Sequence, residues 1–311
     1  MGDFENFQRY SWQFVTFGLK IIEMDQMEKK TLQEFIQLAL HEDVGDGDHT
    51  SLSTIPEGAK GKAHILIKEK GILAGQEVAL SIFTQIDPEI EVTSFFNDGQ
   101  EVNPGDVVLE IYGSVHSILV AERLVLNIMQ RMSGIATITR QVVNEISGTN
   151  AKVLDTRKTT PGIRFLEKEA VRIGGGVNHR FGLYDMILIK DNHVDFAGGI
   201  VNALNASNEY REKLNKKIDI EIEVRGIEEL NEVLEHGGVE RILLDNFDID
   251  QLKKAVELVN KRFVTEASGG ITFKNALEYA STGVDYISMG ALTHSVKSLD
   301  ISLKSNLNNT Y

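Results

Sequence analysis

The second half of the chain alternates short apolar runs with amphipathic stretches. After Asn150 the apolar runs recur, each ends in polar residues or glycine, and helical patterns at about 200–215, 227–236, 249–261 and 273–281 separate most of them. Repeated strand–helix units of this kind predict a (β/α) barrel, in which functional residues gather at the carboxyl ends of the strands. About six strands are strong, so closure at eight is not established, and a doubly wound open sheet is the alternative. The predicted strands are AKVLD (151–155), MILIK (186–190), IDIEIEV (218–224), RILLD (241–245), FVTEAS (263–268) and DYISM (285–289).

The first half of the chain has a different pattern. Apolar residues spaced near 3.6 predict an amphipathic helix at 28–41, and the segment HEDVGDGDHTS (41–51) predicts a turn with Asp and Thr caps. Short β-rich runs in 61–113, separated by Gly, Asn-Asp and Asn-Pro-Gly, predict a small strand-rich unit. Residues 117–143 carry long helical periodicity, in which Gly134 is predicted to form a joint.

Composition places the chain among ordinary globular proteins, with 311 residues, 42% hydrophobic and 25% charged. A net charge of −14 disfavours general binding to nucleic acid or to anionic membranes. No apolar run approaches the roughly 20 residues that span a bilayer. Residues 1–26 lack the features of a signal peptide and are expected to be an extension of unknown role. The absence of cysteine excludes disulfides and thiolate metal sites and fits a reducing compartment, so a cytoplasmic location is expected.

Positive side chains concentrate between residues 155 and 192, against the acidic balance of the whole chain. Cations beside apolar strands predict a pocket for a small, highly anionic ligand. Adjacent Arg and Lys offer a bidentate fork and a point charge. Glycines 174–176 would let the backbone approach a ligand closely. The concentrated cations are Arg157, Lys158, Arg164, Lys168, Arg172, His179, Arg180 and Lys190.

Charged residues also end or interrupt the predicted strands. Lys190 ends an apolar strand, where it would bind an anion or, if desolvated, form a Schiff base. Glu221 and Glu223 alternate with isoleucines and therefore share one face of their strand. In a barrel that face is the interior, where unpaired carboxylates are costly. Together with Asp245 they would hold ribose hydroxyls, coordinate Mg²⁺ through water, or balance the cations.

Two glycine-rich turns follow the last two predicted strands. They are Ser268, Gly269 and Gly270, and then Met289, Gly290 and Ala291. Such turns expose backbone N–H groups at a helix N-terminus, which is how barrels bind phosphate near their last strands. The pair predicts a phosphate site.

The motifs in this order resemble the quinolinate phosphoribosyltransferase family over residues 30–305. The resemblance rests on HEDVGDGDHTS, ERLVLNIMQRMSGIAT, DTRKTTPGIRFLEKEAVRIGGGVNHRFGLYDMILIKDNH, LLDNF, EASGGIT and SMGALTHS. It implies an α/β fold, with an N-terminal α/β sandwich domain (27–133), an incomplete (β/α) barrel (134–294) and C-terminal helices (295–311) that return to the first domain. The implied reaction joins quinolinate and phosphoribosyl pyrophosphate, with Mg²⁺ as cofactor. Its products are nicotinate mononucleotide, pyrophosphate and CO₂, a step of de novo NAD biosynthesis.

The resemblance also implies roles for individual residues. It implies a homodimer, with a hexamer as the larger alternative, in which Arg123 enters the neighbouring subunit's site. Arg157, Arg180, His179 and that Arg123 would clamp quinolinate, while Lys158 and Lys190 would balance the pyrophosphate charge. The implied catalytic residues are Lys158, Lys190, Glu223 and Asp245, of which Glu223 and Asp245 would also hold the metal through water. The further substrate ligands are Thr156, Ser268, Gly269, Gly270, Met289, Gly290 and Ala291.

Two other interpretations remain open at this point. A paralogue associated with molybdenum transport shares much of the pattern, although the intact RKT and NHR motifs favour the biosynthetic enzyme. The segment NDGQEVNPGDVVLEIYG resembles a lipoyl- or biotinyl-type sandwich, which would indicate a carrier or binding module. Such carriers present a lysine in Met-Lys-Met or Asp-Lys-Ala at a hairpin tip, and neither is present, so this unit is interpreted as scaffold.

Overall fold

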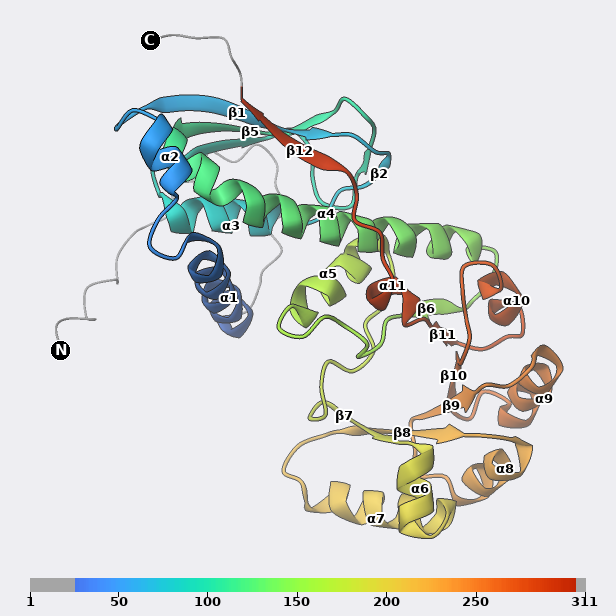
Figure 1. The fold of residues 1–311 in the computed structure, drawn as a ribbon. Helices are drawn as coiled ribbons and strands as arrows, with labels where there is room; N and C mark the ends of the chain where they lie inside the picture. The colour runs from blue at the N-terminus through green and yellow to red at the C-terminus, as the bar shows by residue number, and fades with distance from the viewer. Residues whose placement is uncertain (1–25, 306–311) are drawn as a thin grey trace.

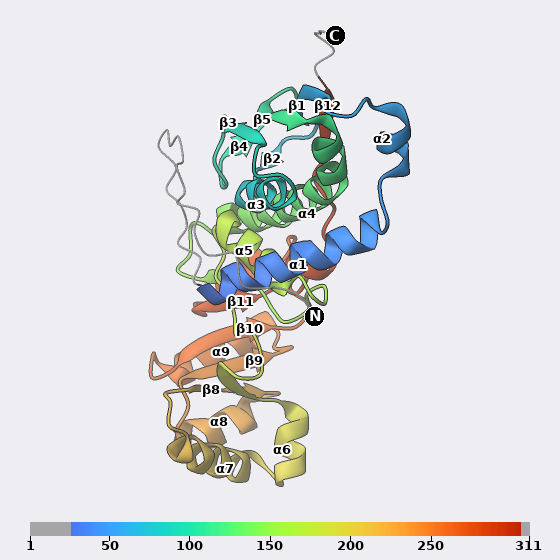
Figure 2. The ribbon, with the colours of Figure 1, turned by 90° about the vertical axis from the view of Figure 1, so that its left-hand side faces the viewer.

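A computed structural model describes residues 26–305. Its N-terminal part combines a four-stranded and a two-stranded antiparallel sheet with helices, above a second part built on a parallel sheet (Figures 1 and 2). The predicted extension, residues 1–26, lies almost entirely outside the described residues. The N-terminal elements are α1 (Gln26–Val44), α2 (His49–Thr54), β1 (Lys60–Ile67), β2 (Gly71–Ile72), α3 (Gln76–Ile86), β3 (Glu91–Ser94), β4 (Glu101–Val102), β5 (Val107–Ser114) and α4 (Val115–Glu145).

The N-terminal part confirms the predicted helix at 28–41 and the strand-rich unit, with one addition. Helix α3 lies inside the segment that was predicted to be rich in strands, and no helix was predicted there. Its buried residues Val78, Ala79, Ile82 and Phe83 are spaced by one, three and four positions, so they form one helical face. In the predicted turn at 41–51, Asp48 accepts a hydrogen bond from the Ser51 N–H (3.1 Å) and caps α2.

The last described segment is a strand, so the prediction of a C-terminal helix is wrong for those residues. Strand β12 (Ile301–Ser305) pairs antiparallel with β1 and completes the sheet order β12-β1-β5-β3 (Figure 1). Ile301 is buried and lies opposite Ile67, and Leu303 lies opposite Ile65. This alternation has a period of two, which suits a sheet and not a helix. Residues 306–311 lie outside the described part.

Helix α4 connects the two parts and does not bend into a joint at Gly134. It is one element from Val115 to Glu145, and it packs against β2, α3, α5 and β12. A Cβ atom at Gly134 would lie 2.3 Å from the Lys297 carbonyl oxygen. The glycine is therefore needed for the close passage of the chain that leads to β12, and the predicted joint is wrong.

The second part is an open barrel of six parallel strands within residues 26–305. The strand order β6-β11-β10-β9-β8-β7 is the chain order of a barrel with its wall open between β6 and β7. A doubly wound sheet would instead reverse direction from a central strand, so that alternative is excluded. The strands are β6 (Lys152–Leu154), β7 (Met186–Ile189), β8 (Asp219–Val224), β9 (Arg241–Asp245), β10 (Val264–Ser268) and β11 (Tyr286–Ser288). The helices are α5 (Arg164–Gly174), α6 (Asp191–Ala197), α7 (Ile200–Lys213), α8 (Ile227–His236), α9 (Ile249–Val259), α10 (Ala276–Ala280) and α11 (Ala291–His294).

At the open side of the barrel, the segment after α5 covers the free edge of β6. Val177 forms a parallel bridge with Leu154, and its N–H donates to the Val153 carbonyl (2.9 Å). The next residues, His179 and Arg180, are thereby carried into the barrel from its edge.

The two faces of the sheet differ in polarity. Glu221 lies opposite Arg241, and Leu243 lies opposite both Glu223 and Glu266, so these charged side chains share the interior face. The buried Ile222, Leu244 and Ala267 lie on the other face, toward the helices. The prediction that Glu221 and Glu223 share an interior face is confirmed.

Candidate active site at the mouth of the barrel

The polar ends of the parallel strands meet at one edge, as the sequence predicts. Thr156–Lys158 follow β6, Lys190 follows β7, Glu223 lies near the end of β8, Asp245 ends β9 and Ser268 ends β10. In a barrel this edge carries the active site, because the loops that follow the strands form its mouth.

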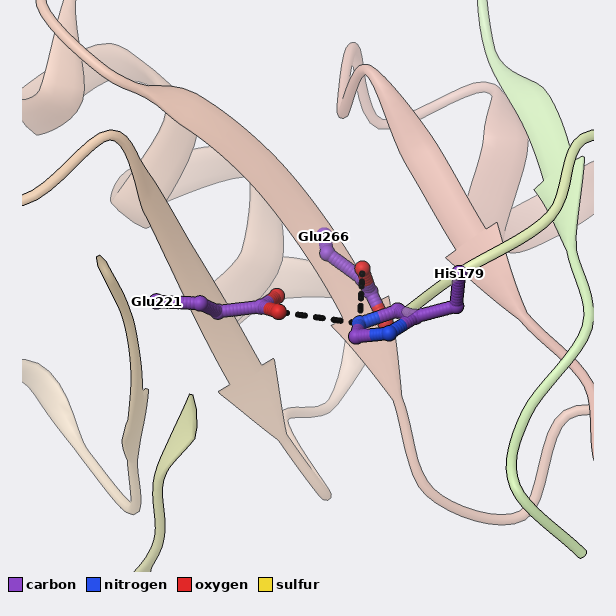
Figure 3. Close-up of side chains that lie close together, drawn as sticks. All are labelled: His179, Glu221 and Glu266. Atoms are coloured by element: carbon purple, nitrogen blue, oxygen red, sulfur yellow. Dashed lines mark ion pairs between the residues drawn. The ribbon is translucent and has the colours of Figure 1, made fainter. Parts of the chain in front are cut away.

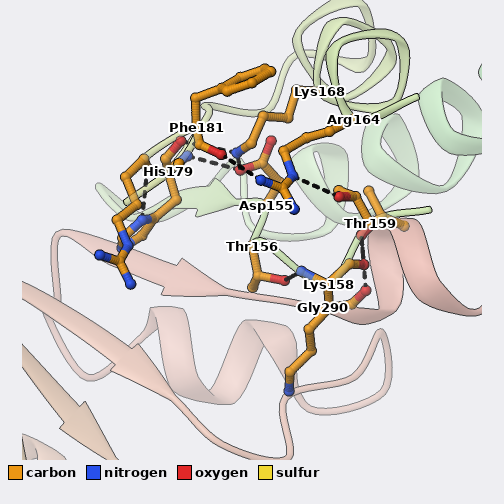
Figure 4. A network of polar contacts seen from close by, with 12 residues as sticks. Asp155, Thr156, Lys158, Thr159, Arg164, Lys168, His179, Phe181 and Gly290 are labelled. Atoms are coloured by element: carbon orange, nitrogen blue, oxygen red, sulfur yellow. Dashed lines mark hydrogen bonds and ion pairs between the residues drawn. The ribbon is translucent and has the colours of Figure 1, made fainter. Parts of the chain in front are cut away.

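Asp155 holds together the segments that form this mouth, a role that the sequence did not reveal. Its buried carboxylate accepts hydrogen bonds from Lys168 Nζ (2.5 Å) and the His179 N–H (2.8 Å). The Asn178 amide, oriented so that its nitrogen donates, reaches Asp155 Oδ2 (2.7 Å). Burial raises the pKa of Asp155, and the charge of Lys168 opposes that rise. Figure 4 shows Asp155 at the centre of contacts that join β6, α5 and the His179 segment.

Three of the eight concentrated cations are structural and do not face a ligand. Lys168 is buried against Asp155, and its Nζ also donates to the His179 carbonyl (2.9 Å). Arg164 joins two loops, since it donates to Thr159 Oγ1 (2.9 Å) and to the carbonyl of Phe181 (3.0 Å; Figure 4). Arg172 pairs with Glu169 on the outer surface of α5. The concentration of cations in the sequence therefore includes three that stabilise the fold and are not part of the predicted pocket.

The glycines at 174–176 serve helix packing. A Cβ at Gly174 would lie 2.6 Å from Thr139 Cβ and 2.7 Å from the Ala136 carbonyl oxygen, both on α4. Gly175 has φ of +96° and caps α5. The predicted close backbone approach exists, but its partner is a helix.

Three other cations at the mouth form no ion pair in the part of the chain that the structure describes. Within residues 26–305 the exposed side chains of Arg157 and Lys158 form no hydrogen bond or ion pair. Arg180 is partly buried, and its Nη1 donates to the Met186 carbonyl (3.2 Å). Burial and, after it, repulsion by the charge of Arg157 lower the pKa of Arg180. Like charges held together in this way favour an anionic ligand between them.

Lys158 lies between the other cations of the mouth and one of the two turns that were predicted to bind phosphate. Its amine points away from the Asp155 network (Figure 4), and its Cδ atom would lie 3.0 Å from a Cβ at Gly290. The Lys158 carbonyl accepts a hydrogen bond from Thr293 Oγ1 (2.8 Å), and the Thr156 hydroxyl accepts one from the Lys158 N–H (3.0 Å). The turn Met289–Ala291 therefore lies beside Lys158, as a shared phosphate site requires.

The turn Ser268–Gly270 is not directly followed by a helix, because α10 begins only at Ala276. This part of the predicted phosphate cradle is wrong in detail. Gly269 has φ of +96°, and a Cβ there would lie 2.2 Å from Asn246 Oδ1. The sequence reasoning gave no role to Asn246, whose side chain donates to Asp245 Oδ2 (2.5 Å). The backbone at Gly269 thus lies directly beside the end of β9.

Lys190, Glu223 and Asp245 form a charged group on neighbouring strands. Lys190 Nζ lies 3.4 Å from Glu223 Oε2, and about half of the Lys190 side chain is exposed. Burial raises the pKa of Glu223, Lys190 opposes that rise, and Asp245 adds to it. A Schiff-base lysine needs to be desolvated, so this geometry favours charge balance over covalent chemistry. Glu223 and Asp245 are carboxylates that repel each other, and Mg²⁺ prefers oxygen ligands, so this pair also fits Mg²⁺.

His179 enters a buried cluster under the mouth (Figure 3). Its Nε2 lies 2.9 Å from Glu221 Oε2 and 3.5 Å from Glu266 Oε2, and Arg241 Nη1 lies 3.0 Å from Glu266 Oε2. Burial favours the neutral ring, but the two carboxylates outweigh it and raise the pKa of His179 to about 9. The ring is therefore positively charged at neutral pH and forms ion pairs with both carboxylates.

This cluster also has the spacing of a metal site. In the described part of the chain, ligand atoms of His179, Glu221 and Glu266 all lie within 4.8 Å of one another. Arg241 already supplies a positive charge there, and Mg²⁺ prefers an octahedron of oxygen ligands. The cluster therefore does not fit Mg²⁺. Sequence reasoning missed Glu266 and Arg241, although a glutamate inside the apolar strand FVTEAS was a usable signal.

Arg123 lies apart from this mouth. It is exposed on α4 in the N-terminal part, and within residues 26–305 its side chain forms no hydrogen bond or ion pair. It precedes Arg131 by two helical turns, and Arg131 is the residue that pairs with Glu167 near the mouth (2.8 Å).

Comparisons with known proteins give one consistent result. Residues 48–133 match the family model of the quinolinate phosphoribosyl transferase N-terminal domain, and residues 135–304 match that of its C-terminal domain. The chain is 49% identical over 288 residues to quinolinate phosphoribosyltransferase [decarboxylating] 2, mitochondrial, of Nicotiana glauca, covering 88% of this chain and 82% of that protein. It is 48% identical over 288 residues to the chloroplastic nicotinate-nucleotide pyrophosphorylase [carboxylating] of Arabidopsis thaliana, with the same coverage of 88% and 82%. The solved nicotinate-nucleotide pyrophosphorylase of Francisella tularensis superimposes with a TM-score of 0.84 at 38% identity, covering 89% of this chain and 96% of that one.

Proposed function

This chain belongs to the quinolinate phosphoribosyltransferase family, and from that premise we propose which residues at its barrel mouth perform the family's reaction. The protein transfers a phosphoribosyl group from phosphoribosyl pyrophosphate to quinolinate with loss of CO₂, and so serves de novo NAD biosynthesis. The observation that carries the assignment is the group of arginines and lysines at the mouth that have no anionic partner or only a loose one.

Quinolinate recognition falls to Arg157 and Arg180. Quinolinate carries two adjacent carboxylates, and in this structure burial and repulsion by Arg157 lower the pKa of Arg180. A dicarboxylate between them removes that repulsion and accepts charge-assisted hydrogen bonds. Arg123 is exposed and unpaired in the described structure, which supports its donation to the neighbouring subunit of a homodimer, the smallest assembly that shares sites in this way. A hexamer would contain the same pair.

The phosphoribosyl pyrophosphate is assigned to the opposite side of the mouth. Lys158 lies beside the turn at Gly290 and would meet phosphate oxygens there, with the turn Ser268–Gly270 as the second backbone contact. Glu223 and Asp245 would hold Mg²⁺ through water, and when bound the ion would neutralise charge on the pyrophosphate. Lys190, 3.4 Å from Glu223, would stabilise the departing pyrophosphate.

The chemistry follows from charge placement. The quinolinate ring nitrogen bonds to C1 of the ribose as the bond from C1 to the pyrophosphate oxygen breaks and pyrophosphate leaves. The positive charge that develops on the sugar is stabilised by Glu223 or Asp245. Once the nitrogen is quaternary, the electron pair of the adjacent C–CO₂ bond stays on the ring carbon as CO₂ leaves, and a proton from water then adds to that carbon to give nicotinate mononucleotide. Positioning and electrostatics therefore supply the rate, and the mechanism needs no nucleophile from the protein.

The direct test is to incubate the protein with quinolinate, phosphoribosyl pyrophosphate and Mg²⁺ and to measure CO₂ and nicotinate mononucleotide. Nicotinate in place of quinolinate is the control, because it lacks the carboxylate next to the ring nitrogen that leaves as CO₂. No product from quinolinate would favour the molybdenum-associated paralogue. The N-terminal family match leaves the carrier-like interpretation of the strand unit without support.

The compartment is a separate matter. None of the helices between residues 26 and 305 is long and apolar enough to cross a bilayer. We propose a cytoplasmic location from the absence of cysteine, and cell fractionation would test it, since plant relatives are named as mitochondrial or chloroplastic.

A further inference from the structure

A buried glutamate on helix α5 holds the loop that carries Lys158. The side chain of Glu167 is 0% exposed. Its carboxylate accepts hydrogen bonds from the N–H (3.0 Å) and the hydroxyl (2.8 Å) of Thr160. It also accepts hydrogen bonds from Nε (3.1 Å) and Nη2 (2.8 Å) of Arg131 on α4. These contacts fill the acceptor sites of a carboxylate, so Glu167 acts on its protein neighbours and not on a ligand.

Arg131 extends these contacts to the turn at Gly290. Its Nη2 also donates to the carbonyl of Thr293 (2.5 Å), a completely buried residue of α11. The Thr293 hydroxyl donates in turn to the Lys158 carbonyl (2.8 Å) and lies 3.3 Å from the Gly290 carbonyl oxygen. The network is therefore closed, because it begins and ends in the loop after β6 and passes through α5, α4 and α11.

Consecutive residues of α5 hold both ends of this loop. Lys168 pairs with Asp155 at one end, and Glu167 holds Thr160 at the other. Lys158 lies between them, and its amine forms no hydrogen bond or ion pair within residues 26–305 (Figure 4). The position of that amine therefore depends on the backbone that the contacts on either side fix.

Stability alone does not account for the pair of Arg131 and Glu167. A buried carboxylate in an ion pair rarely offsets its own desolvation, and apolar side chains of similar volume often stabilise a fold as well or better. Apolar side chains would not supply the donors and acceptors that fix the loop at Thr160 and the turn at Gly290 together. The arrangement therefore points to a role in the geometry of the mouth.

We propose that Glu167 is a positioning residue for phosphoribosyl pyrophosphate. Together with Arg131 and Thr293 it fixes the backbone of Lys158. The Lys158 amine and the turn at Gly290 are thereby held where they meet the same phosphate group. The proposal rests on the assignment of Lys158 to phosphoribosyl pyrophosphate above, and it places no substrate contact on Glu167.

The first test is made at Thr293, because valine has the shape of threonine without its hydroxyl. We expect Thr293→Val to raise the KM for phosphoribosyl pyrophosphate about five- to tenfold, the size of one neutral hydrogen bond. Thr293→Ser keeps the hydroxyl and should retain most of the wild-type KM. The Kd for quinolinate, measured by titration with quinolinate alone, should change less than about twofold in both variants. None of the contacts above involves Arg157 or Arg180, to which quinolinate is assigned.

The second test is made at Glu167 itself. Glutamine has the same size, but one oxygen becomes a donor, so either Thr160 or Arg131 loses its acceptor. We expect Glu167→Gln to raise the KM for phosphoribosyl pyrophosphate about tenfold or more, because the lost contact involves a charged group. The matched control is Glu240→Gln, since Glu240 pairs with Arg211 (2.9 Å) just before β9, at the end of the barrel away from the mouth. The control should keep both constants.

A purely structural role predicts that the constants for both substrates rise by the same factor. That result overturns the proposal, as does a wild-type KM in a folded Thr293→Val or Glu167→Gln protein, or a Thr293→Ser protein that behaves like Thr293→Val. Should Glu167→Gln not fold, the pair of variants at Thr293 carries the test. If the wild-type protein and Glu240→Gln show no turnover of quinolinate, the proposed function fails and the positioning role with it; if they turn over normally and the other variants do too, only the positioning role fails.

Discussion

Removing Arg157 separates binding from folding more cleanly than any other change at the mouth. In Arg157→Ala the protein loses a guanidinium that is exposed and has no partner within residues 26–305. Its charge repels that of Arg180, so its loss relieves an unfavourable interaction in the unliganded protein. The free energy of unfolding should therefore stay within about 0.5 kcal/mol of the wild type.

The loss of quinolinate affinity should be much larger. A charge pair open to water contributes about 0.2–1 kcal/mol, whereas truncating one partner of a water-excluded pair costs about 2–5 kcal/mol. We expect the second range, because Arg180 and an arginine from the second subunit would close on the same dicarboxylate. This corresponds to an increase in Kd of about 30- to 5,000-fold.

Isothermal titration with quinolinate alone measures this directly, since no turnover occurs without the second substrate. Arg172→Ala is the matched control, because Arg172 lies in the same motif but pairs with Glu169 on the outer face of α5. The control should keep the wild-type Kd. An unchanged Kd in Arg157→Ala, or an equal increase in both variants, would refute the assignment of Arg157 to the clamp.

Three further results are expected. A 1:1 mixture of Arg123→Ala and Lys158→Ala proteins should recover about a quarter of wild-type activity, because half of the random dimers hold one intact site of two; no recovery despite shown subunit exchange contradicts sharing. Lys168→Met should lower the free energy of unfolding by about 3–5 kcal/mol in urea, because Asp155 stays buried without its cation. Burial raises the pKa of Asp98 from 3.8 to about 6, so the folded state binds that proton more tightly. Stability should therefore fall by up to about 3 kcal/mol as pH rises from about 4 to about 6, with no such slope in Asp98→Asn.

The local sequence pattern was sufficient to predict the strands of the barrel and the edge at which its active site lies. The apolar runs differ from their surroundings, and their polar ends, such as Lys190 and Asp245, must meet if the strands are parallel. The shared face of Glu221 and Glu223 follows from a period of two. These features depend only on residues close together in the chain.

The partners of the charged residues could not be predicted in the same way. Lys168 and Arg157 look alike in the sequence, yet one is buried against Asp155 and the other is exposed. Their difference depends on how α5 packs on α4 and β6. Likewise, His179 meets Glu266 across a distance of 87 positions in the chain, and no local spacing encodes that contact.

Because the barrel is open between β6 and β7, its mouth has two sides that are built differently. One side is a continuous row of hydrogen-bonded strands, and the glycine turns assigned to the sugar phosphate come from it. The other side is the seam beside β6, where Val177 bridges to Leu154, and His179 and Arg180 follow that bridge in the chain. A substitution along the seam can therefore change which aromatic acid the site binds, without changing how the site binds phosphoribosyl pyrophosphate. Among barrels built in this way, sequence differences that change the acceptor substrate should therefore lie mainly in that segment.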